Sequence, residues 1–205
     1  MPALTSDDFR ALACAMAAAI AANAQRLTDL DSAIGDGDHG ANMKRGFDAV
    51  EAELDQIAAK PLPDALKAAG MKLVMTVGGA SGPLAGTFFM TLGKELAADF
   101  DPAGFVAAYE KAVDAVAARG KSHPGQKTML DVLYPMLDVL KQGGDPDAVA
   151  ARAEEAAEAT IPMLATRGRA SFLGERSIGH MDPGAASVAL LARAVARTLT
   201  AQGGA

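Results

Sequence analysis

Three aspartates separated by glycines stand in the stretch LTDLDSAIGDGDHGANMKRGF, residues 27–47. Carboxylate oxygens are the ligands that Mg²⁺ prefers, and close carboxylates repel one another unless a cation neutralises them. Asp31, Asp36 and Asp38 could converge if the chain wraps, because Gly35 and Gly37 allow the backbone angles of a tight turn. The pattern therefore predicts a metal site, with a solvated acidic turn and an aspartate N-cap as the alternative.

An EF-hand calcium loop does not fit this stretch. Such a loop needs an acidic residue at its twelfth position. The twelfth residue is Gly40 when the count starts at Asp29, and Asn42 when it starts at Asp31. The spacing therefore excludes the EF-hand.

A second glycine-rich stretch is VGGASGPLAGT, residues 77–87, just before a predicted helix. Backbone N–H groups at such a helix start can surround an anion, which the helix dipole also favours. The stretch is not a Walker A loop, because no Lys-Ser or Lys-Thr pair follows the glycines. A phosphate site and a tight turn between helices are both compatible with it.

Two more loops carry polar residues, KSHPGQKTMLD at 121–131 and RGRASFLGERSIGHMDPGAAS at 167–187. Thr128 in the first loop fits a helix N-cap, so helix initiation is its simplest interpretation. Arginines in an otherwise acidic protein suit a polyphosphate, although ordinary surface ion pairs would also explain them. The arginines in question are Arg167, Arg169 and Arg176, near Asp182. We interpret the two loop histidines as hydrogen-bonding residues, namely His123 and His180.

The rest of the chain predicts an all-α fold in a single domain spanning residues 1–205. Half of the residues are hydrophobic, many of them alanine, and no period-two run of β-branched residues predicts a strand. Capping residues, prolines and glycines divide the chain into eight helices joined by short connections, which favours an antiparallel up-and-down bundle. Pro162 should kink or shorten the seventh helix. The expected helices span residues 5–27, 41–58, 64–75, 84–98, 102–119, 128–141, 147–166 and 183–200.

Composition limits the partners and the compartment. The net charge of −6 argues against a broad nucleic-acid or anionic-membrane surface, because both need clustered lysine and arginine. The apolar stretch 12–22 is too short for a membrane span and lacks the basic start of a signal peptide, so we interpret it as a buried helix. Cys14 is the one cysteine, which excludes an intrachain disulfide, and we expect it to be a buried thiol. A cytoplasmic setting fits these features.

The order of the helices places all four unusual loops together. In an antiparallel bundle alternate loops share an end, and the loops 35–42, 78–82, 120–128 and 167–184 precede the second, fourth, sixth and eighth helices. Carboxylates, helix N-termini and arginines gathered at one end of the bundle would suit a nucleotide bound as its magnesium salt. No general base or nucleophile stands out, which agrees with phosphoryl transfer by positioning and charge neutralisation.

These four loops, in this order, resemble the nucleotide-binding L subunit of dihydroxyacetone kinase over essentially the whole chain. The motifs that carry the resemblance are LDSAIGDGDHGANMKRGF, GGASGPLAGTFF, KTMLDVL and GRASFLGERSIGHMDPGAAS. The resemblance implies an eight-helix antiparallel barrel with ADP or ATP at one end, and two Mg²⁺ ions held by Asp31, Asp36 and Asp38. It implies that the nucleotide is bordered by His39, Gly40, Ala41, Asn42, Gly79, Ala80, Ser81, Gly120, Thr128, Met129, Arg169, Arg176, Asp182, Pro183 and Gly184.

The resemblance also implies partners. A separate K subunit should hold dihydroxyacetone, and a phosphohistidine-carrying M subunit should recharge the bound ADP. The alternatives are an L subunit of an ATP-dependent kinase for another short ketose, and a non-catalytic module that signals nucleotide state to a partner such as a transcription regulator. A metal-dependent phosphohydrolase would need His39 as its base. Two residues depart from the family pattern, Gln126 where an acid is frequent and Met181 where a polar residue is frequent.

Overall fold

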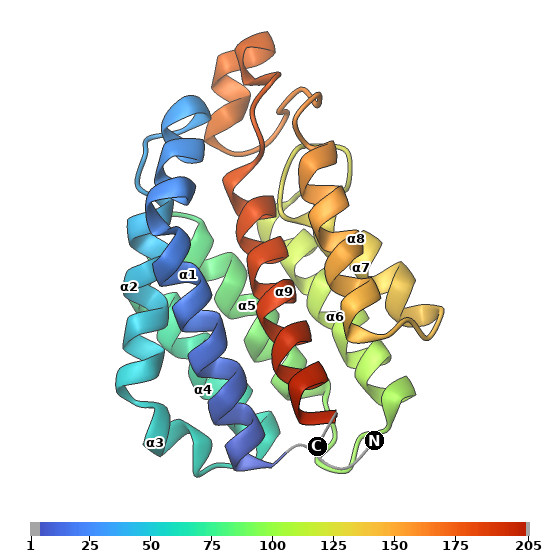
Figure 1. Ribbon diagram of the computed structural model, residues 1–205. Helices are drawn as coiled ribbons and strands as arrows, with labels where there is room; N and C mark the ends of the chain where they lie inside the picture. The colour runs from blue at the N-terminus through green and yellow to red at the C-terminus, as the bar shows by residue number, and fades with distance from the viewer. Residues whose placement is uncertain (1–4, 204–205) are drawn as a thin grey trace.

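The computed structural model describes residues 5–203, and Figure 1 shows the arrangement of the helices. These residues form nine α-helices and one 3₁₀-helix, and no strand occurs among them. The all-α prediction is confirmed, whereas the expected count of eight helices differs from the nine observed. The helices are α1 (Ser6–Ile34), α2 (His39–Ala52), α3 (Leu54–Ala58), α4 (Leu62–Thr76), α5 (Ser81–Glu95), α6 (Pro102–Gly120), α7 (Leu130–Lys141), α8 (Pro146–Ala159), η1 (Arg169–Ser177) and α9 (Pro183–Gly203).

The differences from the predicted bounds are local. The predicted helix 41–58 is interrupted at Glu53, which separates α2 from the five-residue α3. Helix α1 continues to Ile34, so Asp31 lies in its last turn and not in a loop. Helix α8 ends at Ala159, earlier than the predicted residue 166, which agrees with the expectation that Pro162 would shorten this helix. The last two differences concern helix ends, where local signals are weakest.

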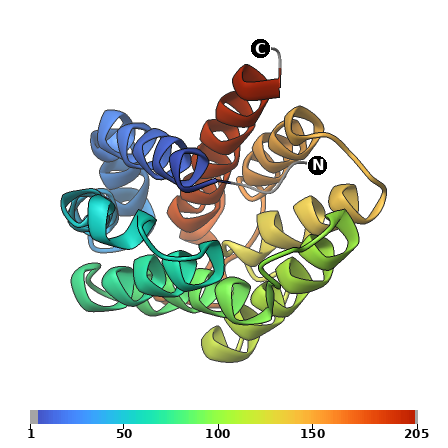
Figure 2. The ribbon, with the colours of Figure 1, turned by 90° about the horizontal axis from the view of Figure 1, so that it is seen from below.

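The long helices form a closed antiparallel barrel. Each long helix packs against the next one in the chain, and α9 packs against both α8 and α1, which closes the ring seen in Figure 2. Short connections between consecutive helices favour this up-and-down order. Local signals start several helices as expected. Thr5 and Asp8 form a capping box at α1, and Asp101 and Asp145 cap α6 and α8, each followed by proline.

The barrel is filled by aliphatic side chains and many alanines. One buried cluster joins α1, α2, α3 and α4 and includes Ile20 and Leu27. A second joins the helices from α5 to α9 and includes Val113 and Val132. Small residues allow helices to pack closely, as the alanine content of the sequence indicated. Among the described helices, none combines the length and apolar character that crossing a membrane requires.

The prediction for Cys14 is wrong. It was expected to be a buried thiol, but it is exposed on the outer face of α1. The inward positions of this part of α1 belong to Ala13 and Ala17, which are 6% and 3% exposed. An alanine-rich helix gives few sequence cues to which face is buried, because alanine suits either face.

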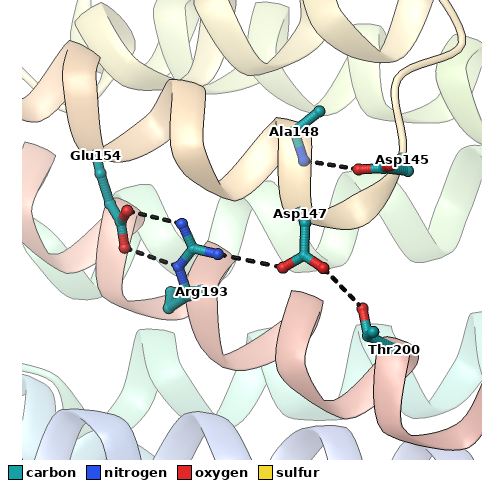
Figure 3. Close-up of polar contacts among 6 residues, drawn as sticks. All are labelled: Asp145, Asp147, Ala148, Glu154, Arg193 and Thr200. Carbon is teal, nitrogen blue, oxygen red and sulfur yellow. Dashed lines mark hydrogen bonds and ion pairs between the residues drawn. The ribbon is translucent and has the colours of Figure 1, made fainter.

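Figure 3 shows a polar network that joins the last two helices of the barrel. The Arg193 guanidinium on α9 donates to both Glu154 oxygens on α8, at 2.8 and 2.7 Å, and to Asp147 at 3.2 Å. Thr200 donates to the other Asp147 oxygen at 3.2 Å. A bidentate pair within a network contributes more than an isolated surface ion pair, so these contacts support the packing of α9 on α8.

Candidate functional site

All four unusual loops lie at one end of the barrel, the upper end in Figure 1. Contacts join them in pairs. Arg169 forms an ion pair with Asp36, and Arg167 donates to the carbonyl of Lys121. The ring of His39 contacts Ser81, which begins α5. The argument from alternating helix direction therefore placed the loops correctly, although the barrel contains one more short helix than expected.

The aspartates converge in the turn between α1 and α2. One carboxylate oxygen each from Asp31, Asp36 and Asp38 lies within 4.8 Å of the others. Asp31 is 8% exposed, and its Oδ2 accepts hydrogen bonds from the N–H groups of Asp38 at 2.9 Å and His39 at 3.1 Å. Asp36 and Asp38 are exposed. Three convergent carboxylates fit a hard divalent cation, because they are oxygen ligands whose mutual repulsion a cation would relieve.

The two glycines of this turn are required by its geometry. A Cβ atom at Gly35 would lie 2.1 Å from Oδ1 of Asp31. Gly37 has φ +73°, a left-handed conformation that other residues adopt at a cost. Glycine at these two positions therefore lets the turn bring Asp36 and Asp38 back to Asp31 without a clash at residue 35 or backbone strain at residue 37.

His39 is buried between three helices. Its Nδ1 lies 3.0 Å from the Ser81 hydroxyl of α5, and its Nε2 lies 2.8 Å from the Ser187 hydroxyl of α9. Burial lowers the pKa of His39, and the Asp31 and Asp38 carboxylates oppose that shift. A neutral imidazole has one donor and one acceptor nitrogen, and both are engaged here. This arrangement argues against His39 as the base of a hydrolase and makes it a link between α2, α5 and α9.

The starts of α2 and α5 face the same region. Gly40 packs against α1, since a Cβ there would lie 1.9 Å from the Ala24 carbonyl oxygen. Asn42 is buried and accepts from Arg45 at 2.6 Å. The backbone N–H groups at these two helix starts offer donors to an anion. The predicted phosphate residues lie in the first turns of α2 and α5 or just before α5, namely His39, Gly40, Ala41, Asn42, Gly79, Ala80 and Ser81.

A cleft of about 320 Å³ opens beside the start of α5. The predicted residues Ala80, Gly120, Thr128 and Met129 line it. Much of the rest of the wall is apolar, which suits a flat aromatic ring such as a nucleotide base. Arg167, one of the arginines considered for a polyphosphate, also lines the cleft. The lining residues that the sequence did not indicate are Pro83, Leu84, Val116, Arg119, Ser122, Leu130 and Gly168.

Asp182, Pro183 and Gly184 form the start of α9 next to this cleft. The Asp182 carboxylate accepts from the Ala185 N–H at 2.7 Å, which caps the helix. Burial raises the pKa of Asp182 from 3.8 to about 7. A Cβ at Gly184 would lie 3.6 Å from Cβ of Met129, so this helix start adjoins the cleft wall.

Residues 161–179, here called the arginine segment, cross the end of the barrel from α8 towards α9 and include η1. Arg169 reaches the aspartate turn, where its Nη2 lies 3.1 Å from Oδ2 of Asp36. Arg176 is exposed at the other end of η1, which bends at Gly174 with φ +56°. The segment therefore brings one predicted arginine to the aspartates, and it leaves the other exposed in the last turn of η1.

Comparison with known proteins identifies the family. Residues 33–197 match the family model described as the DAK2 domain. The chain belongs to the DAK2 domain family. One relative is a protein of Listeria innocua named PEP-dependent dihydroxyacetone kinase 1, ADP-binding subunit DhaL. It is 47% identical to this DAK2 domain, and the match covers 86% of this chain and 88% of the relative. The corresponding Escherichia coli subunit is 45% identical over 83% of this chain and 86% of the relative.

A solved structure resembles this DAK2 domain as well. The dihydroxyacetone kinase of C. freundii in complex with AMP-PNP and Mg²⁺ superposes with a TM-score of 0.76 at 26% identity. The match covers 92% of this chain and 33% of that kinase, so this DAK2 domain spans about a third of the solved chain. The similarity supports the barrel described above.

The two departures from the family pattern have structural roles in this DAK2 domain. The Gln126 side-chain oxygen accepts hydrogen bonds from the Ser122 hydroxyl and the His123 N–H, both at 3.0 Å. A carboxylate could accept the same two bonds, so glutamine preserves the turn. Met181 packs against both hydrophobic clusters of the barrel. It therefore fills space between them.

Sequence reasoning missed Lys127 of the DAK2 domain. It stands between Gln126 and Thr128, yet its side chain is only 1% exposed. Charged residues are almost never fully buried without partners, and a loop lysine carries no pattern that predicts burial. The N-cap of α7 is Met129, one residue after the predicted Thr128. Thr128 still contacts the helix start, because its hydroxyl accepts from the Leu130 N–H at 3.2 Å and its N–H donates to Asp131 at 2.7 Å.

Proposed function

We propose that this chain is the ADP-binding L subunit of a dihydroxyacetone kinase. The observation that carries the proposal is the convergence of Asp31, Asp36 and Asp38 within 4.8 Å at the barrel end that also holds the cleft. The similarity to the L subunits of Listeria innocua and Escherichia coli over most of both chains supports it.

The nucleotide would lie between the cleft and the aspartates. Its base would occupy the apolar cleft beside Leu84 and Met129. Its phosphates would point towards the helix starts, where the N–H groups of α2 and α5 can donate to phosphate oxygens. The arginines of the arginine segment, Arg169 and Arg176, would add charge-assisted hydrogen bonds from above.

We infer that Asp31, Asp36 and Asp38 hold two Mg²⁺ ions with the phosphates. Magnesium bound there would neutralise phosphate charge and so favour phosphoryl transfer. Asp31 is held in place by the N–H groups of Asp38 and His39, which leaves its Oδ1 free to face a cation. The protein's contribution is to position the phosphates and to bring opposite charge to them, because no side chain here is placed as a nucleophile.

The acceptor and the phosphoryl donor would come from other chains. We infer that dihydroxyacetone is held by a K subunit, which must meet the upper end of the barrel to reach the phosphates. An M subunit carrying a phosphohistidine would recharge bound ADP to ATP without its release. A transcription regulator as a further partner stays a prediction from the resemblance.

The first experiment identifies the resident nucleotide. The protein is passed through gel filtration without added nucleotide and then denatured, and the released small molecules are separated by anion exchange. Near-stoichiometric ADP would support a tightly held cofactor that is recharged in place. A protein that is empty but binds supplied ATP would favour the alternative of an exchanging, ATP-dependent ketose kinase. Protein that binds neither nucleotide in the presence of Mg²⁺ would contradict the proposal.

A further inference from the structure

Lys127 has an unusual environment for a lysine. It is the largest fully buried side chain among the described residues. Its backbone has φ +62°, in the left-handed region that lysine rarely adopts. Such a conformation persists only where the surrounding structure determines it, and it concentrates at functional sites.

The ammonium group of Lys127 donates to three backbone carbonyls. The acceptors are Ser177 at 2.7 Å, Met163 at 3.0 Å and Ile161 at 3.3 Å. An ammonium has three donors, so this set of carbonyls satisfies all of them. Burial lowers the pKa of Lys127, and the nearby Asp182 carboxylate opposes that shift. The charge is therefore held by oriented backbone dipoles, with a carboxylate in the vicinity.

These three carbonyls belong to the two ends of the arginine segment. The ends are joined to each other as well, since the Gly179 N–H donates to Ile161 at 2.9 Å and the Ala165 N–H donates to the Ser177 hydroxyl at 3.0 Å. Lys127 lies where these ends meet and ties both of them to the loop before α7. Without its ammonium, three carbonyls would lose a charge-assisted partner, which is most costly for the buried carbonyl of Ser177.

Lys127 connects two parts of the chain that line the cleft. The next residues in the chain, Thr128 and Met129, line one wall, and Arg167 of the arginine segment lines another. Arg176 directly precedes Ser177, the carbonyl with the shortest contact to the ammonium. A displacement of the ends of the segment would therefore move Arg176 relative to the cleft.

We propose that Lys127 is a positioning residue that holds the arginine segment over the bound nucleotide, so that Arg176 reaches the phosphates. The inference rests on the proposed function, because it concerns the same nucleotide site. Lys127 does not touch the nucleotide in this proposal. It acts through the three carbonyls and through the arginine next to one of them.

The test compares ADP dissociation rates from the Mg²⁺-loaded protein. Lys127→Met keeps an unbranched side chain, one heavy atom shorter, but removes the charge and the donors, so we expect ADP to leave about tenfold faster or more. Lys111→Met, at an exposed position of α6, is the matched control and should leave the rate unchanged. Wild-type retention by Lys127→Met would overturn the inference. Wild-type protein that binds no ADP would contradict the proposed function itself.

A double-mutant cycle separates positioning from a general loss of stability. Arg176→Met alone should also speed ADP release about tenfold, but in the Lys127→Met background its additional effect should fall to about threefold or less. A merely structural role for Lys127 would make the two effects multiply, and that result would overturn the proposal. Normal ADP retention by Arg176→Met alone would overturn it too.

A second variant covers the case in which Lys127→Met does not fold. Ser177→Ala removes the hydroxyl that accepts from Ala165 but leaves the lysine and its three carbonyls in place. It should loosen the same end of the arginine segment, so it is measured in the same cycle with Arg176→Met. Amide hydrogen exchange of residues 161–179 shows whether the segment has loosened. ADP release at the wild-type rate from a Ser177→Ala protein whose segment exchanges faster would overturn the inference.

Discussion

The guanidinium of Arg169 lies 3.1 Å from the carboxylate of Asp36, which joins the arginine segment to the aspartate turn. Both side chains are largely accessible to solvent, with exposed fractions of 69% and 37%. Such a pair is worth about 1 kcal/mol or less. Asp36 is also one of the three proposed magnesium ligands, so the guanidinium and the cation compete for the same carboxylate.

Removing this competitor should strengthen metal binding to the nucleotide-free protein. We expect Arg169→Gln to raise the affinity for Mn²⁺, used in place of Mg²⁺, by up to about fivefold at low ionic strength. The gain should shrink as salt is added, because exposed charges are screened. Titration with detection by electron paramagnetic resonance measures this, with Arg152→Gln on α8 as the control. Unchanged or weaker Mn²⁺ binding by Arg169→Gln would show that the pair does not compete with the metal.

Neutralising one aspartate should separate nucleotide retention from stability. Asp36→Asn removes one anionic ligand from the cluster, and we expect Mg²⁺-dependent ADP binding to weaken by about a hundredfold or more. The melting temperature of the nucleotide-free protein should change little, because Asp36 is exposed. Isothermal titration with ADP and Mg²⁺ measures the affinity. Asp48→Asn on α2, whose carboxylate pairs with Lys44, should bind ADP normally. Equal ADP affinity of Asp36→Asn and wild type would count against the metal site.

Close packing between α1 and α2 makes Gly40 sensitive to substitution. An alanine Cβ there would lie 1.9 Å from the Ala24 carbonyl oxygen and 2.5 Å from the Thr28 hydroxyl. Since backbone must move to relieve the first contact, we expect Gly40→Ala to lower the free energy of unfolding by about 1–3 kcal/mol. Gly104→Ala in α6, where the nearest atom would be 3.2 Å away, should change it by less than about 1 kcal/mol. Urea denaturation compares the two, and equal stabilities would show that α1 and α2 separate easily.

The raised pKa of Asp182 predicts a pH-dependent difference in stability. Its pKa is about 7 in the folded protein and near 3.8 in the unfolded chain, so between these values the folded state binds more protons at this group. The contribution of Asp182 to stability therefore falls as the pH rises from about 4 to 7, and it stays constant above that range. Asp182→Asn lacks this titration, and its amide oxygen can still accept from the Ala185 N–H.

The quantity compared is the free energy of unfolding of Asp182→Asn minus that of wild type. We expect this difference to increase as the pH rises from 4 to 7. The increase is at most about 4 kcal/mol for a shift of about three pKa units. Urea denaturation of both nucleotide-free proteins at several pH values measures this difference. Comparison with wild type removes the contributions of the other titrating groups. A difference that stays constant from pH 4 to 7 would show that Asp182 titrates normally in the folded protein.

The sequence by itself determined the features that depend on neighbours along the chain. Thr5 and Asp101 start helices by capping nearby N–H groups, and such signals act within one turn. The spacing of Asp31, Asp36 and Asp38 around glycines indicated their convergence, because the whole turn is eight residues long. Alternating helix direction then placed the four loops at one end, a result that needs only the order of the long helices.

Tertiary structure decided which residues from distant elements meet. His39 lies between Ser81 and Ser187, and Lys127 meets carbonyls more than thirty residues further along the chain. Apolar helix residues such as Leu84 became part of the cleft, and Cys14 was turned outward. No local pattern specifies these outcomes. They follow from how the helices rotate and approach one another to fill the barrel, which is set by the packing of all side chains together.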